Sequence, residues 1–209
     1  MKPGAALLIV DVQNDFLPGG ALPVSEADQV VPIIRSLQNK FDLVVACQDW
    51  HPPDHGSFAA NHPGKAVGET ILLNGLPQTL WPVHCVAGTW GAELAEGIDR
   101  SSIQQIFRKG TDPKVDSYGA FYDNQRLHST GLADFLRSRN VRELYVAGLA
   151  TDYCVRFSAL DALSEGFATI VLPEASRGIE LHSGDIDRAL AAIVQAGGRT
   201  GSVTDILSS

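Results

Sequence analysis

The chain has 209 residues, of which 44% are hydrophobic and 19% charged, and these totals fit one globular domain over residues 1–209. The formal net charge is −8 and the 16 Lys and Arg residues are scattered, so no nucleic-acid partner is expected. No segment reaches the roughly 20 consecutive apolar residues that span a bilayer, so no membrane partner is expected either.

The N-terminal stretch MKPGAALLIVDVQ lacks a small-residue cleavage site and continues into acidic sequence, which favours a strand over a signal peptide. The three cysteines, Cys47, Cys85 and Cys154, form no even set that would predict a disulfide framework. A reducing, cytoplasmic location is therefore expected. Nothing in the sequence sets the oligomeric state, and a homo-oligomer is kept open.

Apolar runs alternate with amphipathic segments along the chain. Strands are predicted at residues 5–11, 42–48, 102–109, 143–149 and 168–175, and helices at 26–40, 131–140, 151–166 and 185–198. Ser25 is expected to cap the first helix, residues 91–98 to form a short helix, and residues 202–207 to form a last short strand. Two long loops are expected at 49–88 and 110–127, a length that usually indicates function.

Strands separated by helices predict right-handed crossovers, and hence an α/β fold with a three-layer, doubly wound, mostly parallel sheet flanked by helices. Continuous apolar runs such as LLIV, LVVA and TIVL fit strands that are buried on both faces. In such sheets, functional sites lie beyond the carboxyl ends of the strands, so the residues at those ends are the first candidates.

Four predicted strand ends carry reactive side chains: Asp11, Asp49 with His51 beyond it, Lys109, and Cys154. Each has a structural explanation when it is taken alone, since an Asp can cap a loop, a Lys can reach solvent and a Cys can pack as a small hydrophobe. Together at one sheet edge they predict a thiol nucleophile, a carboxylate base and a Lys that organises both.

Cys154 lies in the first turn of the predicted 151–166 helix, with Thr151 as the expected N-cap. Nearby positive charge and the unpaired N–H groups of a helix start are expected to lower the pKa of the thiol. The same N–H groups are suited to hold an oxyanion.

Asp49 and His51 lie on one side of an extended segment, and a carboxylate with imidazoles suits a divalent transition metal with open positions. His55, His62 and His84 are the candidates for a third ligand. His84 is favoured because its setting, LWPVHCVAG, is apolar, whereas His62 is expected at the surface. The alternative is a set of loop histidines that bond only to backbone.

Five blocks, IVDVQNDFLPGGALPV, QDWHPPDHGSF, LWPVHCVAGTWGAEL, FRKGTDPKVDSYGAF and VAGLATDYCV, together resemble the nicotinamidases, which are isochorismatase-like cysteine hydrolases. The resemblance runs from about residue 5 to residue 175. It implies that Asp11, Lys109 and Cys154 form the catalytic triad. It also implies the metal ligands Asp49, His51 and His84, and it leaves His55 open as a fourth ligand. The sequence does not name the metal, since one carboxylate and two imidazoles suit zinc, iron or manganese, and zinc is expected first.

The resemblance further implies that Phe16, Trp81 and Tyr118 line the substrate pocket. A cis peptide bond before Ala150 is implied, which turns the Ala150 N–H toward the same point as the Cys154 N–H to form the oxyanion hole. The implied activity is hydrolysis of nicotinamide to nicotinate and ammonia through a thioester, in NAD salvage, with pyrazinamide also accepted. Three alternatives stay open: a related amidase or isochorismatase, a non-catalytic metal-binding scaffold, and a redox-sensing thiol.

Overall fold

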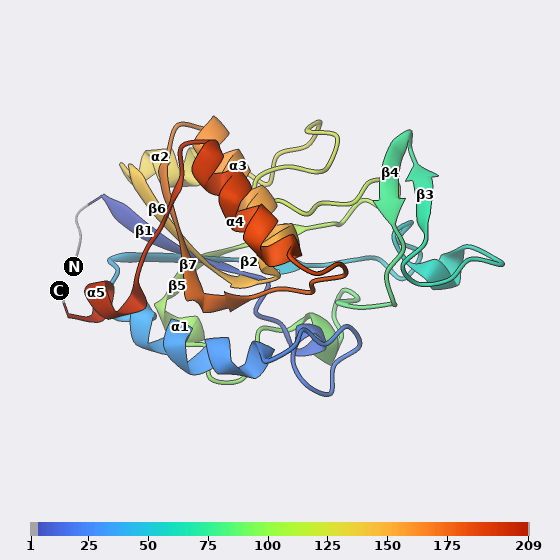
Figure 1. Cartoon of the computed structure of the whole chain (residues 1–209), viewed down its shortest axis with the longest axis horizontal. Coiled ribbons are helices and arrows are strands. Elements are labelled where there is room, and N and C mark those ends of the chain that lie inside the picture. The colour runs from blue at the N-terminus through green and yellow to red at the C-terminus, as the bar shows by residue number, and fades with distance from the viewer. Residues whose placement is uncertain (1–3, 209) are drawn as a thin grey trace.

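A computed structural model describes residues 4–208, which form a parallel sheet between two layers of helices (Figure 1). Residues 1–3 and Ser209 lie outside the described residues. Residues 1–3 belong to the N-terminal stretch for which a strand was favoured over a signal peptide. The sheet has the order β5-β2-β1-β6-β7-β8, and every pairing in it is parallel. The expected doubly wound α/β fold is confirmed.

The six strands of this sheet are β1 (Ala5–Val10), β2 (Leu43–Asp49), β5 (Ile103–Lys109), β6 (Glu143–Leu149), β7 (Ala168–Arg177) and β8 (Arg199–Thr200). Helices α1 (Val30–Gln38) and α5 (Val203–Leu207) cover one face. Helices α2 (Leu132–Ser138), α3 (Arg156–Ser164) and α4 (Asp185–Gln195) cover the other. No helix within residues 4–208 is long and apolar enough to cross a membrane.

Strand β1 shows why these strands are continuously apolar. Leu7 and Ile9 pack into the core beside α1, while Leu8 and Val10 pack into the core beside α2 and α3. All four side chains are fully buried. A strand that is buried on both faces shows no alternation of polar and apolar residues. The apolar run of β1 therefore continues to Val10, and the first charged residue, Asp11, follows at the edge of the sheet.

The N-terminal boundary of the first predicted helix is wrong. Helix α1 begins only at Val30, after a 3₁₀ turn at Ala27–Gln29, and Ser25 caps neither element. Pro32 accounts for the late start, because a proline that lacks an N–H fits the first turn of a helix and not its middle.

Two further short elements differ from expectation. Residues 91–98 form no α-helix, since only Trp90–Ala92 make a 3₁₀ turn and the backbone beyond it bonds outward, with the Ala95 N–H donating to Val12 O. The predicted last strand at 202–207 is helix α5, whose Val203 and Ile206 are buried one helical turn apart. Strand β8 precedes it and is only two residues long.

The first long loop contains a hairpin that the sequence analysis missed. Strands β3 (Thr70–Leu73) and β4 (Leu76–Thr79) pair antiparallel and lie away from the main sheet (Figure 1). The turn is Asn74–Gly75, with both residues at positive φ. Asn-Gly is the preferred pair for a two-residue hairpin turn, so a local signal was present.

The predicted 151–166 helix begins with a π-helical turn at Thr151–Val155 and becomes α-helical only in α3. Ala150, not Thr151, occupies the N-cap position, and its carbonyl accepts from the N–H groups of Tyr153 and Val155. Such turns occur frequently at functional sites. Here the turn follows β6 directly and carries Cys154.

Candidate active site

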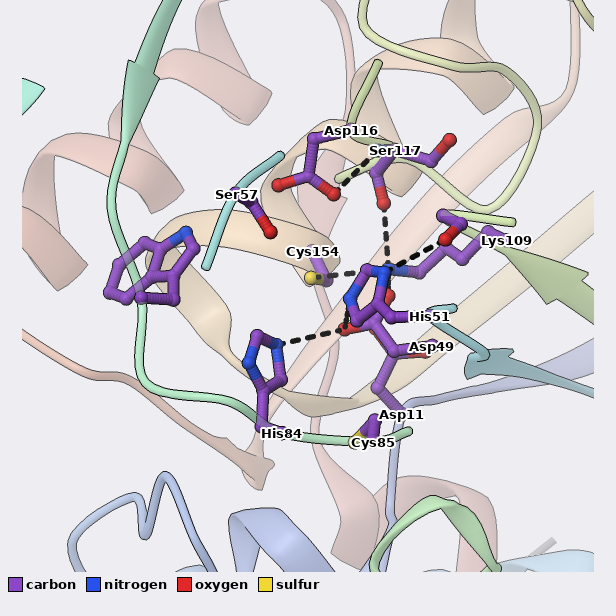
Figure 2. A network of polar contacts seen from close by, with 12 residues as sticks. Asp11, Asp49, His51, Ser57, His84, Cys85, Lys109, Asp116, Ser117 and Cys154 are labelled. Atoms are coloured by element: carbon purple, nitrogen blue, oxygen red, sulfur yellow. Dashed lines mark hydrogen bonds and ion pairs between the residues drawn. The ribbon is translucent and has the colours of Figure 1, made fainter. Parts of the chain in front are cut away.

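The carboxyl ends of β1, β2, β5 and β6 meet at one edge of the sheet and bring four candidate side chains together (Figure 2). Asp49 and Lys109 are register partners at the ends of β2 and β5. Asp11 follows β1 immediately, and Cys154 lies in the turn after β6. The parallel topology therefore produces the juxtaposition expected from the sequence.

Lys109 is the centre of this cluster. Its side chain is fully buried, and Nζ lies 2.9 Å from Asp11 Oδ2 and 2.5 Å from Asp49 Oδ1. The same nitrogen donates to the Ser117 carbonyl at 2.9 Å and to Cys154 Sγ at 3.5 Å. Burial opposes the charge, but the two carboxylates raise the pKa of Lys109 well above its ordinary value. Lys109 is thus a permanent buried cation that does not extend to solvent.

Asp11 has the properties of a proton acceptor near neutral pH. Burial raises its pKa to about 6, against the opposing effect of Lys109. One carboxylate oxygen, Oδ1, accepts a hydrogen bond from Cys47 Sγ at 3.1 Å, and the other faces Lys109. A carboxyl group with a pKa close to the working pH can both take and return a proton.

The pKa of the Cys154 thiol differs from the expectation. Burial raises its pKa well above the ordinary value, and the Asp11 carboxylate adds to this, whereas Lys109 acts to lower it. The predicted net lowering is wrong because removal of the thiolate from water outweighs one ammonium at 3.5 Å. Cys154 therefore carries its proton in the resting protein, and a base has to remove that proton.

Three side-chain atoms that could bind a metal ion converge beside Lys109. Asp49 Oδ2 lies 3.8 Å from His51 Nε2 and 3.9 Å from His84 Nε2, and the three lie within 4.8 Å of one another (Figure 2). His51 Nδ1 is bonded to the Gly110 carbonyl and His84 Nδ1 to the Pro82 carbonyl, each at 2.8 Å. Since each Nδ1 donates to a carbonyl, each Nε2 presents its lone pair to the site.

The electrostatics of this group also fit a metal centre. Burial lowers the pKa of His84 to about 4, so its imidazole is neutral. Burial acts to raise the pKa of Asp49, but Lys109 and the two histidines hold it well below the usual range, so its carboxylate is ionised. Burial acts to lower the pKa of His51, but the Asp49 carboxylate raises it above its ordinary value, so a bound metal would compete with a proton at this ring. One carboxylate and two imidazoles make a donor set for a divalent transition metal.

Gly110 is required beside His51. A Cβ at this position would collide with the His51 imidazole ring, and the φ of +63° lies in the left-handed region. The glycine lets the backbone carbonyl approach His51 Nδ1 and fix the ring.

The two remaining histidine candidates occupy different environments. His55 is fully buried, with its ring 4.3 Å from that of His51, and Nδ1 bonds Ser57 Oγ at 2.7 Å. His55 Nε2 is buried without a hydrogen-bond partner among the described residues, and His51, His55 and Asp116 form a second compact group. His62 is half-buried and bonds the Gly56 carbonyl, outside both groups.

Between the metal group and Cys154 lies a small cavity with largely apolar walls. The three predicted pocket residues, Phe16, Trp81 and Tyr118, line it together with Ala150 and Cys154. Trp81 Nε1 donates to Tyr118 Oη at 3.3 Å, which fixes one wall. The expected cis peptide bond is present between Leu149 and Ala150.

Three residues that the sequence analysis did not single out support the site. Asp116 is buried and accepts hydrogen bonds from the Ser117 N–H and from Gln78 Nε2, at 2.8 and 3.0 Å. Gln78, on β4, also donates to Tyr118 Oη at 3.1 Å, so the hairpin is tied to the pocket. Cys47 could have been found by alternation, since it lies two residues before Asp49 on β2. No local signal marks Gln78.

A buried thiol, a carboxylate and a Lys lie together at one edge of a parallel sheet, an arrangement suited to hydrolysis by a thiol nucleophile. Residues 5–205 match the family described as Isochorismatase domain, and the chain belongs to this family.

Among its relatives is the nicotinamidase of Escherichia coli (strain K12), which is 44% identical over 207 residues, 97% of each chain. A solved structure of the nicotinamidase and pyrazinamidase of Acinetobacter baumanii superposes with a TM-score of 0.95, at 44% identity and 99% coverage of both chains. The pyrazinamidase of Pyrococcus horikoshii, solved in complex with zinc, gives a TM-score of 0.78 at 37% identity, over 96% of this chain and 99% of that one.

Proposed function

We propose that this protein is a metal-assisted nicotinamidase, which hydrolyses nicotinamide to nicotinate and ammonia and also accepts pyrazinamide. The observation that carries the proposal is the position of Lys109, which links the base Asp11 and the thiol Cys154 to the metal ligand Asp49. A nucleophile and a metal group on one cavity suit a flat substrate that has a ring nitrogen at one end and a carboxamide at the other.

The residues present fit the implied metal. Asp49, His51 and His84 would hold a divalent transition ion, and three protein ligands leave positions open. When bound, the ion supplies a Lewis acid that orients the pyridine ring through its nitrogen. Zinc is proposed because the Pyrococcus pyrazinamidase contains it, and the same donors also accept iron or manganese. His55, with an unpartnered and buried Nε2, is a candidate for a further ligand.

The residues of the chain then carry out acyl transfer. Phe16, Trp81 and Tyr118 enclose the ring, and Asp11 takes the proton of Cys154 as Sγ attacks the carboxamide carbon. The N–H groups of Ala150 and Cys154 hold the oxyanion of the tetrahedral intermediate. Asp11 passes the proton to the nitrogen, the C–N bond breaks, and ammonia leaves a thioester on Cys154.

The second half of the reaction restores the thiol. Asp11 removes a proton from water as the water oxygen attacks the thioester carbon, and the C–S bond breaks to release nicotinic acid, which ionises to nicotinate in water. The proton returns to Sγ. Lys109 balances the negative charge of Asp11 in the steps where the carboxylate is ionised, because its Nζ lies 2.9 Å from the carboxylate.

The proposal extends to the metabolic role and the location of the reaction. Nicotinate produced in this way would feed NAD salvage in the cytoplasm, with nicotinamide as the small-molecule partner. A homo-oligomer is compatible with the same site.

The test is ammonia release from nicotinamide by the zinc-loaded protein and by its Cys154→Ala variant. Cys85→Ala is the matched control, because Cys85 is also a free buried thiol but packs in the core on the α1 side of the sheet. We expect release from the parent protein and the control only. Benzamide, which lacks the ring nitrogen, should be hydrolysed much more slowly. Release by Cys154→Ala at the parent rate would contradict the proposal, and preference for another carboxamide would favour a related amidase.

A further inference from the structure

Cys47 touches the proposed base but has no part in the reaction described above. It lies on β2 and is fully buried. Its Sγ donates to Asp11 Oδ1 at 3.1 Å, and its backbone carbonyl accepts from the Asp11 N–H at 3.2 Å. The same residue therefore holds Asp11 both by the main chain and by the carboxylate.

The contact distinguishes the two oxygens of the Asp11 carboxylate. Oδ1 is occupied by the Cys47 thiol, while Oδ2 lies 2.9 Å from Lys109 Nζ. Asp11 also follows β1 in a left-handed conformation, with φ of +48°. Its carboxylate lies off the regular sheet and is oriented by side-chain partners, of which Lys109 and Cys47 are two.

We propose that Cys47 is a positioning residue for Asp11, and that its thiol fixes Oδ1 so that Oδ2 stays directed at the Lys109 ammonium and the Cys154 proton. The inference rests on the proposed role of Asp11 as the base for Cys154. Because Asp11 must be ionised to act as a base, the thiol is the donor of this hydrogen bond. A hydroxyl at the same place can make the same bond, whereas a methyl or isopropyl group cannot.

Packing is the competing explanation, since Cys47 also belongs to the apolar core on the α2 and α3 side of the sheet. The two explanations rank substitutions in opposite orders. If volume matters, Cys47→Val should be tolerated best and Cys47→Ser should behave like Cys47→Ala. If the hydrogen bond matters, Cys47→Ser should be active and both Cys47→Ala and Cys47→Val should be impaired.

The experiment measures two quantities on each zinc-loaded variant. The first is kcat and KM for nicotinamide, and the second is the rate of alkylation of Cys154 by iodoacetamide, followed by mass spectrometry of its peptide. We expect Cys47→Ser to keep both kcat and the alkylation rate within about threefold of the parent protein. Cys47→Ala and Cys47→Val should lower both by about tenfold, with KM little changed, because the loss affects the base and not substrate binding.

A double-mutant comparison shows whether Cys47 acts through Asp11. Asp11→Asn should slow alkylation of Cys154, and adding Cys47→Ala to it should cause no further loss. Cys85→Ala, which removes a buried thiol that bonds Gly91 O and not Asp11, should leave the alkylation rate unchanged.

The proposal is overturned if Cys47→Val retains the parent rates, if Cys47→Ser falls as far as Cys47→Ala, or if the effects of Asp11→Asn and Cys47→Ala are fully additive. The alkylation rate needs no substrate. A failure of the nicotinamidase assignment is therefore seen as absent turnover with an intact dependence of alkylation on Asp11, which is distinct from a failure of the Cys47 proposal.

Discussion

Replacement of Lys109 by Met removes a buried cation from between two buried carboxylates. Lys109 Nζ contacts Asp11, Asp49, the Ser117 carbonyl and Cys154 Sγ, and the variant loses all four contacts at nearly constant side-chain volume. Removing one partner from a buried ion pair costs about 3–5 kcal/mol, because the remaining charge is left uncompensated. We therefore expect Lys109→Met to lower the free energy of unfolding by that amount at pH 8.

The loss should depend on pH in a defined direction. Burial and the absence of Lys109 both keep the folded-state pKa of Asp11 above its ordinary value, so the folded protein binds this proton more tightly than the unfolded chain does. Stability then falls as pH rises through this range, and the variant should lose less at pH 5, where Asp11 is protonated, than at pH 8.

Urea denaturation of the zinc-loaded proteins, followed by tryptophan fluorescence at both pH values, measures these losses. Lys114→Met is the matched control, since Lys114 is exposed on the loop that follows Lys109, and its unfolding free energy should change by less than about 0.5 kcal/mol. The reasoning is refuted if Lys109→Met is as stable as this control at pH 8, or if its loss is equal at pH 5 and pH 8.

Three further outcomes follow from the site. In a pH–rate profile, kcat/KM should fall as pH drops below about 6, because protonated Asp11 cannot accept the thiol proton. Gln78→Leu removes the donor to Tyr118 Oη, and steady-state kinetics should show KM for nicotinamide raised about tenfold with a smaller change in kcat. Gly110→Ala displaces the His51 ring, so competition with a chelator should show zinc affinity lowered about 10–100-fold.

Each of these outcomes has a control. A profile that stays flat from pH 8 to pH 5 would contradict the role of Asp11. Gln105→Leu, at an exposed position of β5, should leave KM unchanged. An equal rise in KM in both Gln variants would contradict the argument that Gln78 supports the pocket wall. Gly64 has a similar positive φ of +79° but nothing near its missing Cβ, so Gly64→Ala tests strain without collision. Equal zinc affinity in both Gly variants would contradict the argument about His51.

The sheet and the edge that carries the candidate site were predictable because local patterns determine them. Apolar strands separated by helices imply parallel order, and parallel order places Asp11, Asp49 and Lys109 at one edge. His84 was favoured as the third ligand because an imidazole in an apolar segment needs a partner, and its Nε2 lies 3.9 Å from Asp49 Oδ2. These inferences require only the order of the elements and the residue that ends each one.

Other features depend on tertiary surroundings that a sequence pattern does not contain. The thiol pKa of Cys154 is raised because burial outweighs Lys109, and the extent of burial is known only once the loops are in place. The role of Gln78 requires the hairpin to fold back over the pocket. The path of the chain after β6 produces the π-helical turn and places Ala150, and not Thr151, at the N-cap position.

The most direct test of covalent catalysis by Cys154 is to trap the acyl group on its Sγ. The zinc-loaded protein is mixed with excess nicotinamide, quenched in acid during turnover, digested, and its cysteine peptides are weighed by mass spectrometry. A thioester mechanism predicts a nicotinoyl adduct on the Cys154 peptide, absent from Cys47 and Cys85 and lost on treatment with hydroxylamine, which cleaves thioesters. Ammonia release at full rate with no adduct at Cys154 under any quench time would contradict covalent catalysis by this thiol.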